Sequence, residues 1–235
     1  MKAVAFIRQV LLDTISILYP SLCASCDELL LQGEDVICTH CMVNLPRTYF
    51  HRMPDNPVAK QFWGKVKLEG ATALFHFHKG EKVQTLMHRL KYNNRPEIGN
   101  KLGAVCATEI IKSEPFNQVD FIIPIPLHKK KQKIRGYNQA YCFAQGMADI
   151  YGKEVLKDGL RRVKFTDTQT RKNRFDRHKN VKMVFKVSKP ARFIGKKVMI
   201  VDDVLTTGST LAACIQLFND IEGAKVIVAT IAYAE

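Results

Sequence analysis

VMIVDDVLTTGSTL, residues 198–211, indicates the fold class more clearly than any other segment of the chain. Its first half is the apolar run of a buried strand, and this run ends in two adjacent aspartates, Asp202 and Asp203. Its second half, from Thr206 to Thr210, consists of small polar residues and leads into the stretch STLAACIQLFNDIEGA, which is typical of a helix. The order of strand, polar loop and helix is the unit from which parallel α/β sheets are built.

The rest of the chain repeats this alternation of apolar strands and helices. The sequence NNRP, residues 93–96, separates two predicted helices because asparagine and proline interrupt a helical pattern. Strands are predicted over residues 71–80, 119–127, 196–204 and 225–235, and helices over 81–113 (broken once), 138–152 and 209–224. We therefore expect a doubly wound α/β fold with a mostly parallel sheet.

A four-cysteine motif lies near the start of the chain. The pattern C-x2-C-x11-C-x2-C comprises Cys23, Cys26, Cys38 and Cys41. Two CxxC pairs at this spacing are typical of a tetrahedral structural zinc site, and a closed shell of four thiolates leaves no open position for catalysis. Disulfides need an oxidising compartment and a redox pair needs only one CxxC, so both alternatives fit less well. We predict structural Zn²⁺.

Residues 1–19 predict an amphipathic helix and not a secretion signal. Arg8 and Asp13 interrupt the apolar stretch, and no small-residue cleavage site follows. No apolar run approaches the roughly 20 residues that span a bilayer. We expect a cytoplasmic protein without a membrane span. Its expected parts are an N-terminal helix (1–19), a zinc-ribbon-like module (20–50), a linker with an edge strand (51–78) and the α/β domain (79–235).

The positive charge of the chain is concentrated in one segment. The chain carries a formal charge of +14, but residues 128–198 hold 21 Lys or Arg against 5 Asp or Glu, a net +16. The remainder holds 15 against 17, a net −2. This concentration predicts attraction for phosphates or nucleic acid, although a solubilising surface has the same composition.

The acid pair and the loop after it predict a sugar-phosphate site. In parallel α/β sheets, ligands bind beyond the carboxyl ends of the strands, where Asp202 and Asp203 stand. Backbone N–H groups and hydroxyls at the start of the next helix form a cradle for phosphate, while the carboxylates accept hydrogen bonds from ribose hydroxyls. The loop is neither a Walker A motif nor a dinucleotide fingerprint. An ordinary helix cap leaves the adjacent carboxylates unexplained.

The stretch 198–211 resembles the phosphoribosyl pyrophosphate signature of type I phosphoribosyltransferases. More narrowly, the chain resembles the ComF competence-protein family, in which a four-cysteine zinc module precedes such a domain. This narrower resemblance also rests on the stretches IIPIPLHKKKQKIRGYNQA, HRLKYNNRPEIG and TDTQTRKNRFDRHKNV. It covers about residues 20–235. It implies transfer of a phosphoribosyl group, with Mg²⁺ held mainly by oxygens of phosphoribosyl pyrophosphate.

The resemblance implies a role for each part of the site. Asp202 and Asp203 recognise the ribose, and the 5′-phosphate is held by Thr206, Thr207, Gly208, Ser209 and Thr210. The loop 125–129 grips pyrophosphate, and a mobile hood, residues 130–137, follows it. The candidates for pyrophosphate binding are His128, Lys129, Lys130 and Arg135. Lys129 and Arg135, with the two aspartates, are the predicted catalytic residues, because cations stabilise the charge that develops as the glycosidic bond breaks.

No set of residues names the phosphoribosyl acceptor. The resemblance implies a part in the uptake and processing of incoming DNA during natural transformation, with single-stranded DNA and the DNA-uptake machinery as partners. The candidate DNA contacts are Lys131, Lys133, Arg171, Lys172, Arg174 and Arg177. Tyr137, Phe165 and Phe175 could stack on bases, although packing is the commoner use of such aromatics. Two alternatives stay open: salvage of a free nucleobase with release of pyrophosphate, and DNA binding without turnover.

Overall fold

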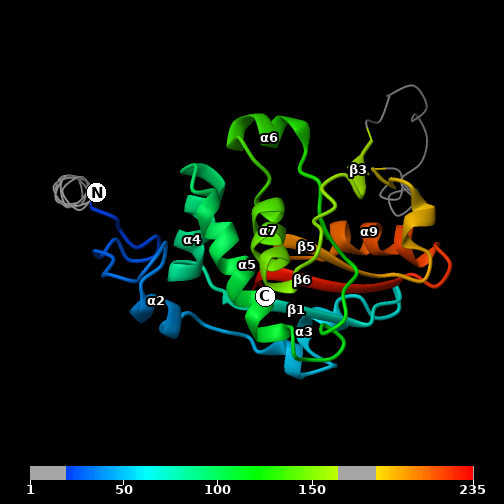
Figure 1. Cartoon of the computed structure of the whole chain (residues 1–235), viewed down its shortest axis with the longest axis horizontal. Coiled ribbons are helices and arrows are strands. Elements are labelled where there is room, and N and C mark those ends of the chain that lie inside the picture. Colours follow the sequence, from blue (N-terminus) through cyan, green and yellow to red (C-terminus); the bar gives the residue numbers. More distant parts are fainter. Residues whose placement is uncertain (1–19, 164–183, 235) are drawn as a thin grey trace, which may run out of the picture. The chain divides into compact units, whose positions relative to one another are not determined.

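Figure 1 shows the computed structural model of the chain, which describes residues 20–163 and 184–234. The chain divides into two compact units, one ending at Leu45 and one beginning at Pro46. The helix predicted over residues 1–19 lies outside the described residues. Within the described part of the chain, no helix is long and apolar enough to cross a membrane.

The first unit contains little regular structure. Two isolated antiparallel bridges, Leu22 with Leu29 and Asp35 with Ile37, precede helix α2 (Thr39–Asn44). Among its described residues, 20–45, the buried apolar side chains are Cys23, Ala24, Ile37, Cys38, Cys41 and Leu45. Because half of these are metal-ligand cysteines by the sequence pattern, this described part has too few large apolar side chains to be stable through a hydrophobic core alone.

The second unit is built on a parallel sheet of four strands in the order β1-β6-β5-β2. The strands are β1 (Gly70–Phe77), β2 (Phe121–Pro124), β5 (Lys197–Leu205) and β6 (Lys225–Ala234). In the register of the sheet, Val201 lies opposite Pro124 and Asp202 lies opposite Thr230. The end of β2 is therefore level with the start of the acid pair. A separate antiparallel pair joins β3 (Leu160–Arg162) and β4 (Phe185–Val187).

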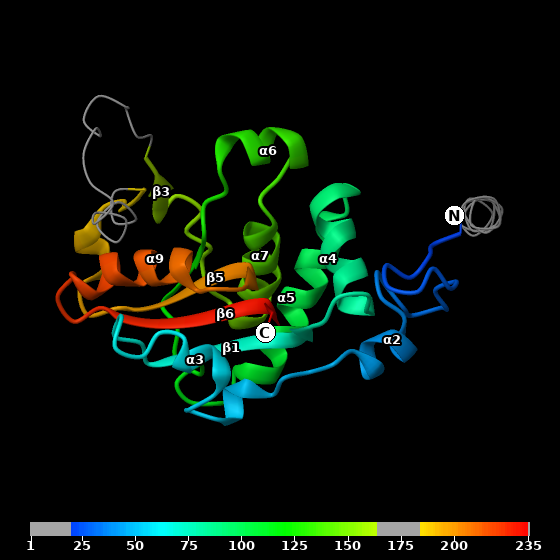
Figure 2. The same cartoon turned by 180° about the vertical axis from the view of Figure 1, so that it is seen from behind.

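Helices cover both faces of this sheet, which confirms the doubly wound α/β fold (Figure 2). The helices are α3 (Pro57–Lys60), α4 (Lys82–Tyr92), α5 (Pro96–Ile110), α6 (Lys129–Arg135), α7 (Gln139–Tyr151) and α9 (Ser209–Asn219), with short 3₁₀ turns η1 (Phe50–Arg52) and η3 (Pro190–Phe193). Val198 and Ile200 of β5 pack with α9 residues such as Phe218 in one core cluster. Met199 and Val201 alternate with them and are fully buried, and α7 contacts β5 and β2.

Glycines bring α5 and α7 into close contact. A Cβ at Gly103 would collide with the backbone oxygen of Phe143, and one at Gly146 would collide with that of Asn100. Figures 1 and 2 show the two helices side by side. This close packing fixes the start of α7, which lies next to the carboxyl end of β2: the Asn138 amide donates to the Ile125 carbonyl at 2.9 Å.

Two predicted segments have a defined structure. The segment 51–78, predicted as a linker with an edge strand, belongs to the second unit, and its strand, β1, lies at one edge of the four-stranded sheet. On the outer edge the His76 N–H donates to the Pro46 carbonyl at 2.9 Å, and the Thr48 N–H donates to that of Leu74 at 3.1 Å. The segment predicted as a hood contains helix α6, which begins after His128 and ends at Gly136, where φ is 78°. The sequence analysis did not predict the β3–β4 pair.

Candidate functional site

A cleft of about 370 Å³ opens at the carboxyl ends of β2 and β5. Its ionisable lining side chains come from α4, the β2–α6 connection, α6, β3 and β5, and they are Lys91, His128, Lys131, Arg135, Arg162, Asp202 and Asp203. Thr210, in the first turn of α9, lines the same cleft. The structure therefore brings together the predicted ribose acids, part of the predicted phosphate loop and part of the predicted basic set.

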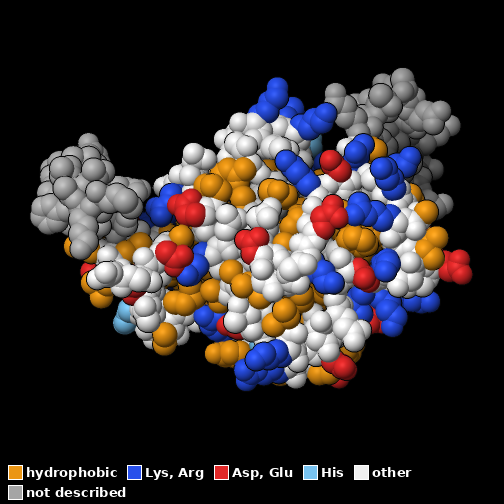
Figure 3. Space-filling model, in the orientation of Figure 1, with side chains coloured by type: hydrophobic (Ala, Val, Ile, Leu, Met, Phe, Trp, Pro, Cys, Tyr) orange, Lys and Arg blue, Asp and Glu red, His pale blue; other side chains and the backbone are white. Residues whose placement is uncertain are grey.

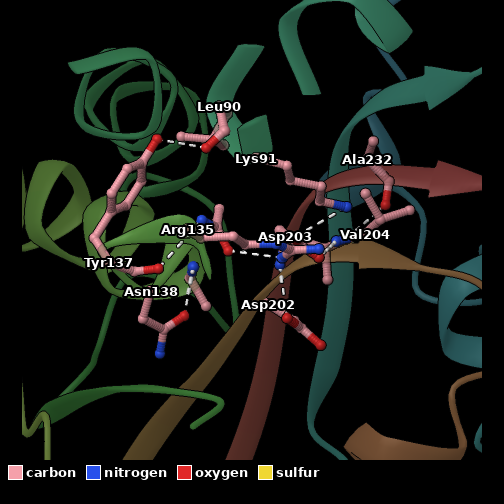
Figure 4. Close-up of polar contacts among 12 residues, drawn as sticks. Leu90, Lys91, Arg135, Tyr137, Asn138, Asp202, Asp203, Val204 and Ala232 are labelled. Atoms are coloured by element: carbon pink, nitrogen blue, oxygen red, sulfur yellow. Dashed lines mark hydrogen bonds and ion pairs between the residues drawn. The ribbon is translucent and has the colours of Figure 1, made fainter. Parts of the chain in front are cut away.

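The two aspartates of the cleft make different contacts. Asp202 Oδ1 accepts the Asp203 N–H at 2.8 Å, and Asp203 Oδ1 accepts the Val204 N–H at 2.7 Å. Asp203 Oδ2 lies 3.0 Å from the Lys91 ammonium, and about a fifth of each of these two side chains is exposed. Figure 4 shows Lys91 reaching from α4 toward Asp203, whereas the Asp202 carboxyl points away from it. One acid is therefore paired, and the other is open to a ligand.

The pKa of Asp202 follows from this arrangement. Burial and the neighbouring charge of Asp203 raise the pKa of the Asp202 carboxyl to about 8, against the opposing effects of the Asp203 N–H and the Lys91 cation. Asp202 is mostly protonated at neutral pH, so the pair carries a single negative charge that Lys91 balances. A protonated carboxyl donates as well as accepts, and the pair can therefore offer both functions to vicinal hydroxyls.

The loop after the acid pair forms the predicted turn into a helix. Gly208 caps α9 with a φ of 68°, a conformation that favours glycine, and no side chain caps this helix. The N–H groups of the first turn consequently have no intrahelical acceptors. The side chains of Thr206, Thr207 and Ser209 are exposed, and the hydroxyls of Thr207 and Ser209 lie 3.2 Å apart. This geometry can hold an anion.

Gln61, which the sequence analysis missed, contacts the back of this loop. Its Nε2 donates to the Thr206 carbonyl at 3.0 Å, and its Oε1 is buried without a hydrogen-bond partner among the described residues. A Cβ at Gly208 would lie 3.0 Å from that oxygen and 3.3 Å from the Phe62 ring. Gln61 follows α3, far from the loop in sequence, and no local pattern distinguishes it from an ordinary polar residue.

The predicted basic residues are divided between two clefts. Arg135 and Lys131 line the cleft of the acid pair, whereas Lys129, Lys130 and Lys133 line a neighbouring cleft of about 600 Å³. His128 and Arg162 line both clefts. Figure 3 shows Lys and Arg side chains gathered over α6 and around the β3–β4 pair. The basic residues thus line both the cleft of the acid pair and the cleft beside it.

Lys91, Arg162 and Asn138 complete the site and were not predicted. Lys91 stands in the stretch HRLKYNNRPEIG, but a lysine in the last turn of an amphipathic helix usually faces solvent. Arg162 stands at the end of β3, and its guanidinium carbon lies 5.2 Å from the Phe185 ring centroid. Asn138 caps α7, because its Oδ1 accepts the Ala140 N–H at 3.1 Å.

Several predicted nucleic-acid contacts are outside this description. Arg171, Lys172, Arg174 and Arg177, with the aromatic residues Phe165 and Phe175, lie outside the described residues. Tyr137 is described, and its hydroxyl donates to the Leu90 carbonyl. Burial raises the pKa of Tyr137 to about 12. Tyr137 is therefore a packing residue whose hydroxyl is hydrogen-bonded within the fold.

The four cysteines of the first unit converge as a metal site requires. Their sulfur atoms all lie within 4.8 Å of one another, and those of Cys26 and Cys38 are 3.8 Å apart. A tetrahedral site with Zn–S bonds of about 2.3 Å places its sulfurs about 3.8 Å apart. Burial raises the pKa of the Cys23 thiol. Hydrogen bonds from the N–H groups of Cys38 and Ser25 have a larger opposite effect, and the pKa of Cys23 is lowered to about 7. The donor set fits a closed structural metal site.

Comparisons with known proteins support the assignment of this domain. A family model described as "Phosphoribosyl transferase domain" matches residues 138–235. The chain is 30% identical over 195 residues to competence protein F of Haemophilus influenzae, covering 81% of this chain and 80% of that protein. It is 33% identical over 138 residues to DNA utilization protein YhgH of Salmonella typhimurium, covering 57% of this chain and 60% of that protein.

Solved structures show a weaker similarity. The allosteric regulatory enzyme of purine biosynthesis and the glutamine phosphoribosylpyrophosphate amidotransferase from B. subtilis, complexed with ADP and GMP, each match with a TM-score of 0.44 and 18% sequence identity. Each match covers 62% of this chain and 30% of the other chain.

Proposed function

This chain belongs to the family of competence protein F and DNA utilization protein YhgH, and on that premise we propose that it binds phosphoribosyl pyrophosphate with Mg²⁺ and acts in the handling of incoming single-stranded DNA. The observation that carries the proposal is the acid pair at the end of β5, followed directly by the loop into α9. This pairing of two carboxylates with an anion cradle suits a ribose that carries a 5′-phosphate.

Each part of the ligand has a matching group. The ribose hydroxyls meet Asp202 and Asp203, of which the protonated Asp202 donates and the ionised Asp203 accepts. The 5′-phosphate lies on residues 206–210, whose backbone N–H groups face it at the helix start. The pyrophosphate lies toward Lys131, Arg135 and Arg162, the cations that line the same cleft.

These positive side chains supply the electrostatics of a transfer reaction. When the glycosidic bond breaks, negative charge accumulates on the leaving pyrophosphate, and guanidinium and ammonium groups stabilise it. Mg²⁺, bound mainly through oxygens of the substrate, neutralises part of the same charge. Lys129 and Lys130 line the neighbouring cleft and not the cleft of the acid pair. We assign Arg135 the larger share of this role.

Titration calorimetry tests the proposal. Mg²⁺–phosphoribosyl pyrophosphate should bind the wild-type chain, and an Asp202→Ala, Asp203→Ala double variant should lose that binding. Asp158→Asn is the matched control, because 78% of the Asp158 side chain is exposed and it lines neither of the two clefts. Unchanged binding in the double variant would refute the site. A panel of nucleobases, assayed for release of pyrophosphate, then separates a salvage enzyme from a protein that only binds.

DNA binding is a second function, favoured by the basic surface over α6 and the β3–β4 pair (Figure 3). Single-stranded DNA should bind with an affinity that falls steeply as salt rises, and a Lys131→Ala, Lys133→Ala variant should show a smaller salt slope. The exposed Lys112, in the turn after α5, provides the control substitution. Fluorescence anisotropy across a salt series measures the DNA affinity and its salt slope for each variant. An affinity that does not change with salt contradicts the proposal.

The four-cysteine unit has a structural role in this proposal. Cys23, Cys26, Cys38 and Cys41 would hold zinc, which supplies the cross-links that the small unit lacks. Metal analysis of the purified chain should give about one zinc per chain.

A further inference from the structure

An exposed tyrosine stands at the border of the cleft. Tyr92 is the last residue of α4, and 61% of it is exposed. The residue before it, Lys91, reaches Asp203 in the cleft at 3.0 Å, so the end of α4 forms one edge of the site. A single exposed aromatic residue is common on protein surfaces and means little by itself.

The arginine beside Tyr92 distinguishes it from such residues. The guanidinium carbon of Arg135 lies 5.4 Å from the Tyr92 ring centroid, and Arg135 also lines the cleft. Arg135 Nη1 donates to Gln139 Oε1 at 2.8 Å, and Gln139 is only 1% exposed. A buried amide thus fixes the direction of a guanidinium that lies over an exposed ring.

A further hydrogen bond holds the two elements of this pair together. Tyr137 lies between α6 and α7, and its hydroxyl donates to the Leu90 carbonyl in the last turn of α4 (Figure 4). The end of α4 and the start of α7 are therefore tied at the point where Tyr92 meets Arg135. His88, one turn earlier on α4, adds a second ring whose centroid is 5.1 Å from that of Tyr92.

We propose that Tyr92 and Arg135 form a stacking shelf for a nucleobase beside the phosphoribosyl cleft. The inference rests on the proposed function, because it names the chemistry of the group that approaches the phosphoribosyl site. Flat heteroaromatic rings stack on tyrosine and on guanidinium planes with little dependence on base identity. The ligand is a nucleobase, either free or within single-stranded DNA.

The charges around the shelf select the same chemistry. Apart from the acid pair, which Lys91 partly neutralises, the ionisable groups that line the cleft are His128, Lys131, Arg135 and Arg162. These groups repel a cationic acceptor such as a protonated amine. A neutral planar base, or a base that carries a phosphate backbone, meets no such repulsion.

Fluorescence quenching of 2-aminopurine tests the shelf in the full-length protein without phosphoribosyl pyrophosphate. The probes are free 2-aminopurine, a short oligothymidylate with one 2-aminopurine, and a fully abasic oligonucleotide of the same length, whose binding is followed by fluorescence anisotropy. Tyr92→Ala should weaken binding of a base-containing probe by roughly 5- to 150-fold, and Tyr92→Trp should restore it. Tyr49→Ala is the matched control: Tyr49 is 47% exposed and stacks on Arg52 at 4.9 Å, outside the cleft lining.

The outcomes separate the sources of the base. Loss of affinity for free 2-aminopurine assigns the shelf to a free base, and loss for the oligonucleotide alone assigns it to single-stranded DNA. Equal affinity of Tyr92→Ala and wild type for both probes overturns the inference, as does an equal loss for the abasic probe or in Tyr49→Ala. Tyr92→Ala should bind Mg²⁺–phosphoribosyl pyrophosphate as wild type does. If wild type fails to bind that ligand while Tyr92→Ala still loses base binding, the proposed function fails and the shelf stands.

Discussion

Asp202→Asn should stabilise the free protein, and the gain should grow with pH. The pKa of Asp202 in the folded protein is about 8 because of burial and the charge of Asp203. An aspartate in the unfolded chain has a pKa of about 3.9, so the folded state binds the extra proton across the window between about pH 4 and pH 8. The contribution of the Asp202 carboxyl to the stability of the wild type is therefore fully present below about pH 4. It is lost as the pH rises to about 8.

The magnitude follows from the width of that window. Each pH unit within it lowers the free energy of unfolding of the wild type by roughly 1.4 kcal/mol relative to the variant, which amounts to roughly 4 kcal/mol between pH 5 and pH 8. Asparagine keeps an Oδ1 that accepts the Asp203 N–H, now held at 2.8 Å, so the substitution leaves the backbone contact in place.

Urea denaturation at pH 5 and pH 8, followed by the fluorescence of Trp63, the single tryptophan, measures the effect. Asp158→Asn, at an exposed carboxylate, should show a difference from wild type that stays within about 0.5 kcal/mol at both pH values. A pH-independent difference for Asp202→Asn, or a variant less stable than wild type at pH 8, would refute the reasoning. If the effect is found, Asp202 is a destabilising residue whose presence the site requires.

Other substitutions test the remaining contacts. Lys91→Met should raise the pKa of the Asp202 carboxyl further, seen by carbon NMR, because the Lys91 cation that opposes this rise is lost, and Lys91→Arg should not. Gln61→Leu should weaken binding of Mg²⁺–phosphoribosyl pyrophosphate about 5-fold, for a lost hydrogen bond worth about 1 kcal/mol, whereas Gln118→Leu at an exposed site should bind normally. Gly146→Ala should lower the free energy of unfolding by about 1–3 kcal/mol, because α5 and α7 must separate, and Gln145→Ala should change it little. Cys41→Ser should remove the zinc and the ordered NMR signals of residues 20–45, while the circular dichroism of the α/β unit persists.

Local patterns predicted the parts of the fold whose signals are local. The apolar run before Asp202 marks a buried parallel strand, and Asn93 and Pro96 mark the break between α4 and α5. The cysteine spacing predicted a cluster whose sulfurs do converge. Helix α6 was not predicted, because seven residues without a buried side chain give no periodic apolar signal.

The missed site residues are those whose position depends on tertiary structure. Lys91 lines the cleft because the last turn of α4 lies level with the end of β5. The helical pattern in the sequence does not show how the helix is positioned along the strand. Gln61 reaches Thr206 across 145 positions of sequence. The division of the basic residues between two clefts likewise follows from the path of α6, whereas the sequence shows only that they are concentrated.

A crystal structure of the chain with Mg²⁺ and phosphoribosyl pyrophosphate would locate each part of the ligand in the proposed site. We expect electron density for the 5′-phosphate on the N–H groups of residues 206–210, and ribose hydroxyls within hydrogen-bond distance of Asp202 and Asp203. The diphosphate should face Arg135. Density for the ligand elsewhere, or a cleft that remains empty at saturating ligand while the protein is folded, would contradict the account.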